Sequence, residues 1–590
     1  MPPYLHTFIC AQTKSTKIRQ LSALILIASS FTLFGCSSVS SSDIQQDQAN
    51  SKSIAPVIST KDNNIEALLK AEFTLQREGP NRAFVPIYKI AKKTRDKTLA
   101  EKLVRVAIAS QNNENIEKSA DLLLSISPEN EQAHALKIQM KIQSHDADNA
   151  AKLIEFAIEH KISLQFLPLY IDKNIRNTDL INTVESTLSQ LSASDNTNLF
   201  IKASHARTQF SAGEFQSAIK TSQALLSNRD TMDTEPLFLI LAYSQDQLDN
   251  TKSAITTIEK GRLQFPHSIR LLAPLLEFLV KSKQTDTAIQ RYQDAELDTP
   301  SRLQIGITFG NLLLSSGHPD VALTILNQLP KEQYGFENQA SYLKATALSD
   351  LGQKQHAIIE MKKVSGVLNA HATNQIALWL YDEEKEQEIN DMVLMRTSKS
   401  HISEVVSTIC LLHEEHKQHG LSSELLHKTL QLYPESKALR YRKALLDDAI
   451  GNWKSTVTEL NILLADAPLN PQYLNALGYT LLTRSNDIDK AMSYIEKAYS
   501  QNDKDPAIID SLGWGYFLQG KLIKASFYLK KAWNTLQDAE IAAHYGEVLW
   551  QQNAHQEANR IWQEALNNTP QNALLIETVT RLNPSLLDNY

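Results

Sequence analysis

A step of about 34 residues, a length typical of repeat architectures, recurs along most of this sequence and constrains the fold more than any other feature. In the middle of the chain, Pro266 and Pro300 keep this step, and each follows an alanine by twelve residues. The alanine series is Ala254, Ala288, Ala322 and Ala357, with steps of 34, 34 and 35. Such regular spacing is typical of a chain built from stacked copies of one small supersecondary unit.

The same step returns near the end of the chain. Pro434 and Pro468 are separated by one such step, and Pro570 follows after three more. Small residues keep the step between these prolines, in three series: Gly478, Gly513 and Gly546; Ala491, Ala525 and Ala558; Ala498, Ala532 and Ala565. Because several independent series share one phase, chance does not explain them.

A unit of this length fits two antiparallel helices, which is the tetratricopeptide pattern. A small residue midway along the first helix lets the second helix approach closely, and alanines on the second helix form a face for the next unit. Proline ends the second helix because it lacks an N–H group. The 17 glycines are too few for a turn-rich sandwich or a glycine-loop enzyme. We therefore expect an all-α fold, a right-handed superhelical solenoid of antiparallel helix pairs.

The N-terminus has the three parts of an export signal: a basic region with Lys14, Lys17 and Arg19, an apolar stretch over residues 21–34, and a cysteine after a small residue. The run Leu33-Phe34-Gly35-Cys36 resembles a bacterial lipobox, although Phe34 stands where a small residue is usual. The resemblance implies lipid attachment at Cys36. The serines that follow imply an outer-membrane location, facing the periplasm. An uncleaved signal anchor is the alternative.

These features divide the chain into six segments. The first is a lipoprotein signal peptide over residues 1–35, and the second is a lipidated, polar, flexible tether over residues 36–60. The helical segments that follow are divergent repeats over 61–200, tetratricopeptide repeats over 201–364, a divergent joint over 365–420 and further tetratricopeptide repeats over 421–585. Within them, residues 130–195 and 365–420 lack the small-residue pattern of the other repeats.

Composition also limits the chemistry of the chain. The net charge of −7 is spread without long basic blocks, so nucleic acid is not an expected partner. After loss of the signal and lipidation of Cys36, only Cys410 keeps a free thiol, so no intramolecular disulfide can form. No phosphate loop, nucleophile elbow or paired-cysteine motif is present. We therefore expect no enzyme activity, no cofactor and no metal.

One cluster superficially resembles a zinc-binding helix. His413 and His416 flank two glutamates, but the histidines are three residues apart, and zinc helices of this kind need a spacing of four. We interpret the cluster as a solvated helix face. The charged run over residues 382–388 likewise predicts an exposed face near a loop.

The expected function lies on a surface. In a tetratricopeptide pair the first helix lines the inner wall of the solenoid, and positions on both sides of its small midpoint face inward. Aromatic side chains beside carboxylates are suited to anchoring a protein partner. The predicted partner-binding groove comprises Gln472, Asn475, Tyr479, Asp510, Trp514, Phe517, Glu547 and Trp550. The alternative for Phe517 and Trp550 is packing between repeats.

The C-terminal third resembles a known family through three motifs, and the N-terminal segment resembles it through Ala71-Glu72, Thr94-Arg95-Asp96 and Leu99-Ala100-Glu101 with Arg105. The family is that of large tetratricopeptide-repeat outer-membrane lipoproteins of Gram-negative bacteria. The C-terminal motifs are Gly478-Tyr479-Thr480-Leu481, Asp510-Ser511-Leu512-Gly513-Trp514 and His544-Tyr545-Gly546-Glu547-Val548-Leu549-Trp550.

The resemblance implies an adaptor function. The best-understood type in this family is the binding partner of a periplasmic carboxyl-terminal processing protease. It tethers and activates the protease and presents peptidoglycan hydrolases for degradation. Two other function classes stay open: a scaffold for the assembly or secretion of pilus, polysaccharide or outer-membrane proteins, and a peptidoglycan-active enzyme. The enzyme is disfavoured because no catalytic group can be assembled from the sequence.

Overall fold

The computed structural model describes residues 64–191, 198–227, 234–330, 335–485 and 487–589, and these residues form helices and connecting turns without a β-strand. They divide into two compact units, whose boundary at Leu312 and Leu313 falls inside helix α17. The lipobox and Cys36 lie outside the described residues.

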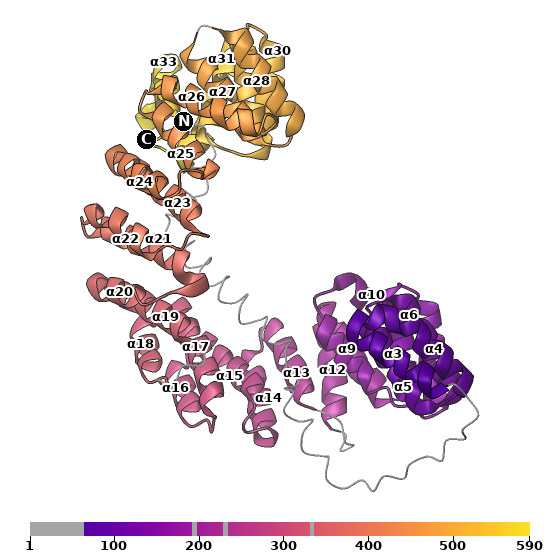
Figure 1. Ribbon diagram of the computed structural model, residues 1–590. Helices are drawn as coiled ribbons and strands as arrows, with labels where there is room; N and C mark the ends of the chain where they lie inside the picture. The colour runs from indigo at the N-terminus through magenta and orange to yellow at the C-terminus, as the bar shows by residue number, and fades with distance from the viewer. Residues whose placement is uncertain (1–63, 192–197, 228–233, 331–334, 486, 590) are drawn as a thin grey trace. The chain divides into compact units, whose positions relative to one another are not determined.

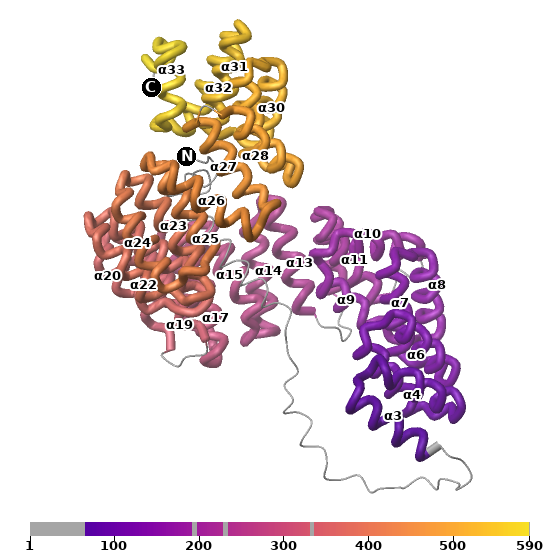
Figure 2. The backbone as a smooth tube through the Cα atoms, turned by 45° about the horizontal axis from the view of Figure 1, so that its top comes forward, coloured from indigo at the N-terminus to yellow at the C-terminus, as the bar shows by residue number. Residues whose placement is uncertain are grey.

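The N-terminal unit consists of successive antiparallel helix pairs, in which most helices contact the next helix along the chain. Figure 2 shows the second helices α4, α6, α8 and α10 following one another in this order. The helices are α3 (Asn64–Glu78), α4 (Pro80–Thr94), α5 (Lys97–Ala109), α6 (Asn113–Ile126), α7 (Glu131–Gln143), α8 (Ala147–Glu159), α9 (Phe166–Asn174), α10 (Thr178–Ser189), α11 (Leu199–Ser211), α12 (Phe215–Leu226), α13 (Glu235–Gln247), α14 (Thr251–Gln264), α15 (Ile269–Lys281), α16 (Thr285–Gln293) and α17 (Thr299–Ser315).

The C-terminal unit repeats this arrangement, and Figure 1 shows the pairs α19/α20, α21/α22 and α23/α24 laid one against the next. Its elements are α18 (Pro319–Asn327), α19 (Glu337–Asp350), α20 (Lys354–Met361), η3 (Gly366–Leu368), α21 (Asn369–Asp382), η4 (Glu386–Glu388), α22 (Ile389–Arg396), α23 (Ile402–Glu415), α24 (His419–Leu432), α25 (Lys437–Ala449), α26 (Trp453–Asp466), α27 (Pro471–Arg484), α28 (Ile488–Gln501), α29 (Pro506–Leu518), α30 (Leu522–Thr535), α31 (Ala539–Gln551), α32 (His555–Asn568), α33 (Ala573–Leu582) and η5 (Pro584–Asn589).

The two helices of a pair approach closely at the glycine midpoints of the last first helices. A methyl carbon added to Gly513 would lie 2.7 Å from Cγ of Leu529 and 3.1 Å from its backbone nitrogen. At Gly478 the added carbon would meet Ile495 at 2.6 Å. Because backbone on the partner helix blocks the added carbon, only glycine fits there without a shift. The expected all-α fold of antiparallel tetratricopeptide helix pairs is confirmed.

The first helices of the last repeats begin in the same way. An Asn or Asp precedes each helix, and its side-chain oxygen accepts a hydrogen bond from a backbone N–H in the first turn, which satisfies a donor that the helix leaves free. Asp505 accepts from the N–H of Ala507 at 2.9 Å, and Asp538 accepts from that of Glu540 at 2.8 Å. Asn470 and Asn572 cap α27 and α33 in the same manner. The N-terminal caps of these first helices therefore recur along the chain, as the contacts between paired helices do.

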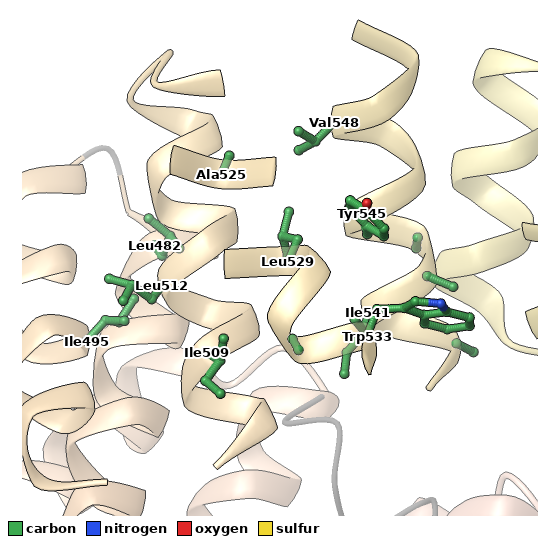
Figure 3. Close-up of a cluster of buried hydrophobic side chains, with 14 of the residues drawn as sticks. Leu482, Ile495, Ile509, Leu512, Ala525, Leu529, Trp533, Ile541, Tyr545 and Val548 are labelled. Carbon is green, nitrogen blue, oxygen red and sulfur yellow. The ribbon is translucent and has the colours of Figure 1, made fainter. Parts of the chain in front are cut away.

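A single core cluster runs through the last repeats of the C-terminal unit. In Figure 3, Leu512 of α29 and Leu529 of α30 lie within this cluster, and Ile541 and Val548 of α31 continue it into the next pair. Each of these four side chains is almost fully buried. Burial of a Leu or Ile side chain contributes roughly 1.5–3 kcal/mol, so this continuous core is the main source of stability for these repeats.

The predicted joint over residues 365–420 includes α23 and the start of α24, a helix pair that keeps the small-residue pattern in another form. Cys410 of α23 takes the midpoint position, one repeat step before Ala444 of α25. Oγ of Ser422 donates a hydrogen bond to the carbonyl of Cys410 at 2.9 Å, as Oγ1 of Thr456 does to Ala444 in the next pair. Burial raises the pKa of the Cys410 thiol to about 12. Cys410 is therefore a packing residue of an ordinary repeat.

The interpretation of His413 and Glu414 as a solvated helix face is wrong. His413 is fully buried, with Nε2 2.9 Å from Oδ1 of Asn390 and Nδ1 hydrogen-bonded to the hydroxyl of Tyr381. Glu414 is buried too, in an ion pair with Arg442 of the next first helix. Polar partners on neighbouring pairs make this burial possible, and these partners are not visible in the sequence of the cluster itself.

Candidate functional site

The eight residues of the predicted groove come from three successive first helices, α27, α29 and α31, which contact one another. We call this set the first-helix face. Gln472 is exposed, and four aromatic side chains are half-buried: Tyr479, Trp514, Phe517 and Trp550. The polar members Asn475, Asp510 and Glu547 are buried. The structure thus brings the set together on adjoining helices, with its aromatic rings more accessible than its carboxylates. Partner binding by this face remains a prediction.

Asp510 is fully buried because it is paired with a residue of the next repeat. Nδ1 of His544 on α31 lies 2.9 Å from Oδ2 and 3.1 Å from Oδ1 of Asp510. Burial alone would lower the pKa of His544, but the charge and hydrogen bond of Asp510 outweigh it, and the pKa is raised. Asp510 therefore does not reach the surface. Its contribution to the first-helix face is to fix the position of His544.

Two aromatic rings of this face, those of Trp514 and Phe517, form a continuous stack with that histidine. The Trp514 ring lies nearly parallel to the His544 ring, with ring centres 4.2 Å apart. The Phe517 ring stacks on Trp514 in turn, with ring centres 4.8 Å apart. Tyr479 of α27 lies 6.4 Å from His544. Stacked aromatic pairs add roughly 0.5–1.5 kcal/mol beyond their buried area, so this row forms an aromatic platform that joins α29 to α31.

The two residues of α31 in the predicted groove have structural partners. Glu547 pairs with Arg581 of α33, at 2.6 Å between Oε2 and the guanidinium nitrogen, and this pair crosses to the next repeat. Trp550 lies 5.6 Å from Trp562 and 4.2 Å from His555, both on the second helix of its own pair. Trp550 and Phe517 are both packed against the core cluster while staying half-buried. Their packing supports the alternative of a structural role without removing them from the surface.

Two buried hydrogen-bond acceptors in and beside the face lack donors. Oδ1 of Asn475 and Oε2 of Glu540 are buried with no hydrogen-bond partner among the described residues. Burial raises the pKa of Glu540 to about 7, and Asp538 and Asp510 act in the same direction. Burial also raises the pKa of the Tyr479 hydroxyl, and the carboxylates of Glu540, Asp510 and Asp448 raise it further. The platform therefore presents an acidic, donor-poor environment beside its aromatic rings.

Sequence reasoning missed two residues of this arrangement, His544 and Glu540. The signal for His544 was available, since it lies one repeat step after Asp510 and thus at the matching position of the next first helix. Glu540 gave no comparable signal, because its lack of a donor depends on which side chains surround it. In the part of the chain that the structure describes, no group of three potential metal ligands is close enough to hold an ion.

No described helix combines the length and apolar character that crossing a membrane requires. A comparison with family models gave no match. Among curated proteins, the chain is similar to the TPR repeat-containing protein PA4667 of Pseudomonas aeruginosa, with 39% identity over 124 residues. This match covers 21% of each protein, so the chain spans about a fifth of the length of that relative.

The chain was also compared with solved structures. TTC0263, a thermophilic TPR protein of Thermus thermophilus, is 19% identical and matches 31% of this chain and 99% of its own, with a TM-score of 0.28. Cut9–Hcn1 of the APC/C and the yeast Tom70 are 12% and 11% identical. They match 88% and 89% of this chain and 97% and 96% of their own, each with a TM-score of 0.29. These TM-scores are too low to support a conclusion, so the fold is assigned from the helix pairs of this chain alone.

Proposed function

We propose that the chain is an outer-membrane-anchored periplasmic scaffold that binds protein partners through its C-terminal repeats. Its partner is a carboxyl-terminal processing protease, which the scaffold tethers and activates, and to which it presents peptidoglycan hydrolases for degradation. The observation that supports binding is the row of Phe517, Trp514 and His544, an aromatic platform in which Trp514 and Phe517 stay only half-buried beside acidic groups.

The choice of partner rests on resemblance. The family-like motifs of the C-terminal third lie on α27, α29 and α31, where they build the platform. The lipobox-like sequence at Cys36 supports anchoring at the outer membrane. A scaffold of this kind accelerates turnover by raising the local concentration of protease and substrate, without contributing a reacting group.

The test is binding of the full chain to a purified periplasmic carboxyl-terminal processing protease, with Trp514→Ala as the variant. Removing a central aromatic anchor should cost about 2 kcal/mol or more of affinity, roughly thirtyfold. The intrinsic peptidase activity of the protease should not change, but its stimulation by the scaffold should fall. Because Trp514 stacks on His544, a circular dichroism melt of the same variant must accompany the binding measurement.

Phe527→Ala on the outer helix α30 is the matched control, since it removes an exposed aromatic ring of the same repeat from another face. It should bind the protease like the wild type. If Trp514→Ala also binds normally, the first-helix face is not the docking surface. If the wild type fails to bind the protease but co-purifies with components of pilus, polysaccharide or outer-membrane assembly, the alternative scaffold function replaces the one proposed.

A further inference from the structure

The outer face of α30, a second helix, is a different surface from the first-helix face of α27, α29 and α31. From Lys521 to the end of the helix at Thr535 there are four lysines, Lys521, Lys524, Lys530 and Lys531, and no acidic residue. Two large apolar side chains project from the same helix into solvent: Ile523 is 85% exposed and Phe527 is 66% exposed. A single helix thus combines exposed apolar side chains with uncompensated positive charge.

These apolar side chains cannot turn inward, because the opposite side of α30 is filled. Ala525 and Leu529 are fully buried, and Leu529 packs against α29 at Gly513. Ile523 and Phe527 are four residues apart, so they lie one turn apart on the outer face. Lys524 and Lys530 are exposed beside them. The helix therefore has a narrow apolar outer ridge with a lysine on each side.

Three of the four lysines are held in place by aromatic rings without being neutralised. The ammonium groups of Lys521 and Lys524 lie over the ring of Tyr516, at 5.6 and 5.1 Å from its centre. Lys531 lies over Tyr499 and donates hydrogen bonds to its hydroxyl and to the carbonyl of Asp503. A ring face attracts a cation but carries no net charge.

No ion pair involves any of these four lysines among the described residues. Lys530 does act electrostatically on Glu557 of α32. The pKa of Glu557 is lowered first by its hydrogen bond to Arg560 and only to a lesser degree by Lys530. The positive charge of α30 therefore remains available to an external anion.

We propose that α30 docks on an anionic phospholipid surface. Ile523 and Phe527 enter the boundary between headgroups and acyl chains, and the lysines contact lipid phosphates. Interfacial helices bind membranes through this combination of apolar ridge and flanking lysines. A protein partner fits less well, because two projecting side chains offer far less than the roughly 800 Å² per partner of a stable protein interface.

The experiment measures the membrane insertion of α30 directly, through a fluorophore placed on this helix. Asn534 is exposed and lies on the same helix face as Ile523, Phe527 and Lys530. A full-length chain with Cys10→Ser, Cys36→Ser and Asn534→Cys carries one accessible thiol, because Cys410 is fully buried. A polarity-sensitive fluorophore on that thiol reports insertion at α30, whatever the N-terminal residues do.

We expect the emission to rise with phosphatidylglycerol vesicles and not with phosphatidylcholine vesicles, and to fall again as salt is raised. Each lysine near an anionic surface strengthens binding roughly fivefold, so Lys524→Glu with Lys530→Glu should weaken it by at least about twenty-five-fold. Ile523→Ser with Phe527→Ser should abolish the response. Leu263→Ser is the matched control, since Leu263 is 85% exposed on α14 of the other unit, and it should change nothing.

The side chains substituted on α14 and α30 are all exposed, so the melts of these variants should match the wild type. No response to phosphatidylglycerol vesicles, or an equal response to both lipids, overturns the proposal. A response that requires an added acidic protein instead of vesicles assigns the ridge to a protein partner and overturns it too. Trp514→Ala should leave the vesicle response intact, which keeps this test separate from that of the protease-binding face.

Discussion

His544 donates from Nδ1 to the carboxylate of Asp510 at 2.9 Å, across a sequence distance of 34 residues. The two residues occupy successive first helices, so their contact fixes how one repeat sits on the next. Trp514 covers the histidine ring, which places this polar contact directly beneath the aromatic platform. The surface proposed for partner binding and the stacking of the repeats therefore depend on the same pair.

Asp510→Ala should destabilise the C-terminal repeats by about 3–5 kcal/mol, because it leaves a buried histidine without its partner. Hydrogen exchange of α29 and α31, measured by mass spectrometry, should accelerate while the N-terminal unit keeps its protection. Asp503→Ala is the control, since Asp503 is an exposed residue of the neighbouring turn. Equal protection in the two variants would show that the pair contributes little.

Acid and base should loosen different repeats of the C-terminal unit. The pKa of His544 is raised, so its contribution to stability is complete below about pH 6.5 and is lost as the pH rises through the raised value. Glu540, with a pKa raised by burial to about 7, acts in the same direction. Burial lowers the pKa of His413 to about 4, so its contribution is complete above about pH 6.5 and is lost as the pH falls toward 4.

Hydrogen exchange at pH 5 and pH 8, corrected for intrinsic rates, measures this difference. We expect α23 to be less protected at pH 5 and α31 to be less protected at pH 8. His413→Asn should remove the acid response of α23 without altering the response of α31. A change of the same sign in both helices would contradict the assignment of the two histidines.

The close approach at Gly513 predicts a strong effect of a single methyl group. Gly513→Ala should cost about 1–3 kcal/mol, because the new carbon meets both the side chain and the backbone of Leu529. Gly420→Ala in α24 is the matched control, since nothing lies within 4 Å of the added carbon there and alanine favours a helix. Thermal melts that rank the two variants in the opposite order would reject the proposed helix register.

The lipobox-like sequence predicts that Cys36 anchors the chain. Cys36→Ser removes the thiol that would be acylated, so the protein should move from the outer-membrane fraction to the soluble periplasm, or stay unprocessed at the inner membrane. Cell fractionation with immunodetection measures this, and Cys10→Ser should behave as the wild type. A Cys36→Ser protein that stays in the outer membrane would mean that another element holds it there.

The sequence determined the fold class through positions where packing permits few residue types. The series of Gly478, Gly513 and Gly546 could be recognised because helices in close contact exclude side chains, and this requirement repeats with the helix pair. Cys410 and Ser422 were missed because they meet the same requirement with other small side chains. The residues of the first-helix face were also located from this register, since side-chain direction along a helix follows from its period.

Only the tertiary structure decided which polar side chains are buried and what they contact. Asp510 and His413 have the composition of surface residues, yet both are fully buried because a neighbouring helix supplies a partner. Conversely, Ile523 and Phe527 look like core residues and are exposed, because Ala525 and Leu529 already occupy the inner side of α30. Sequence period sets the direction of a side chain, whereas burial and charge pairing depend on what another part of the chain places opposite it.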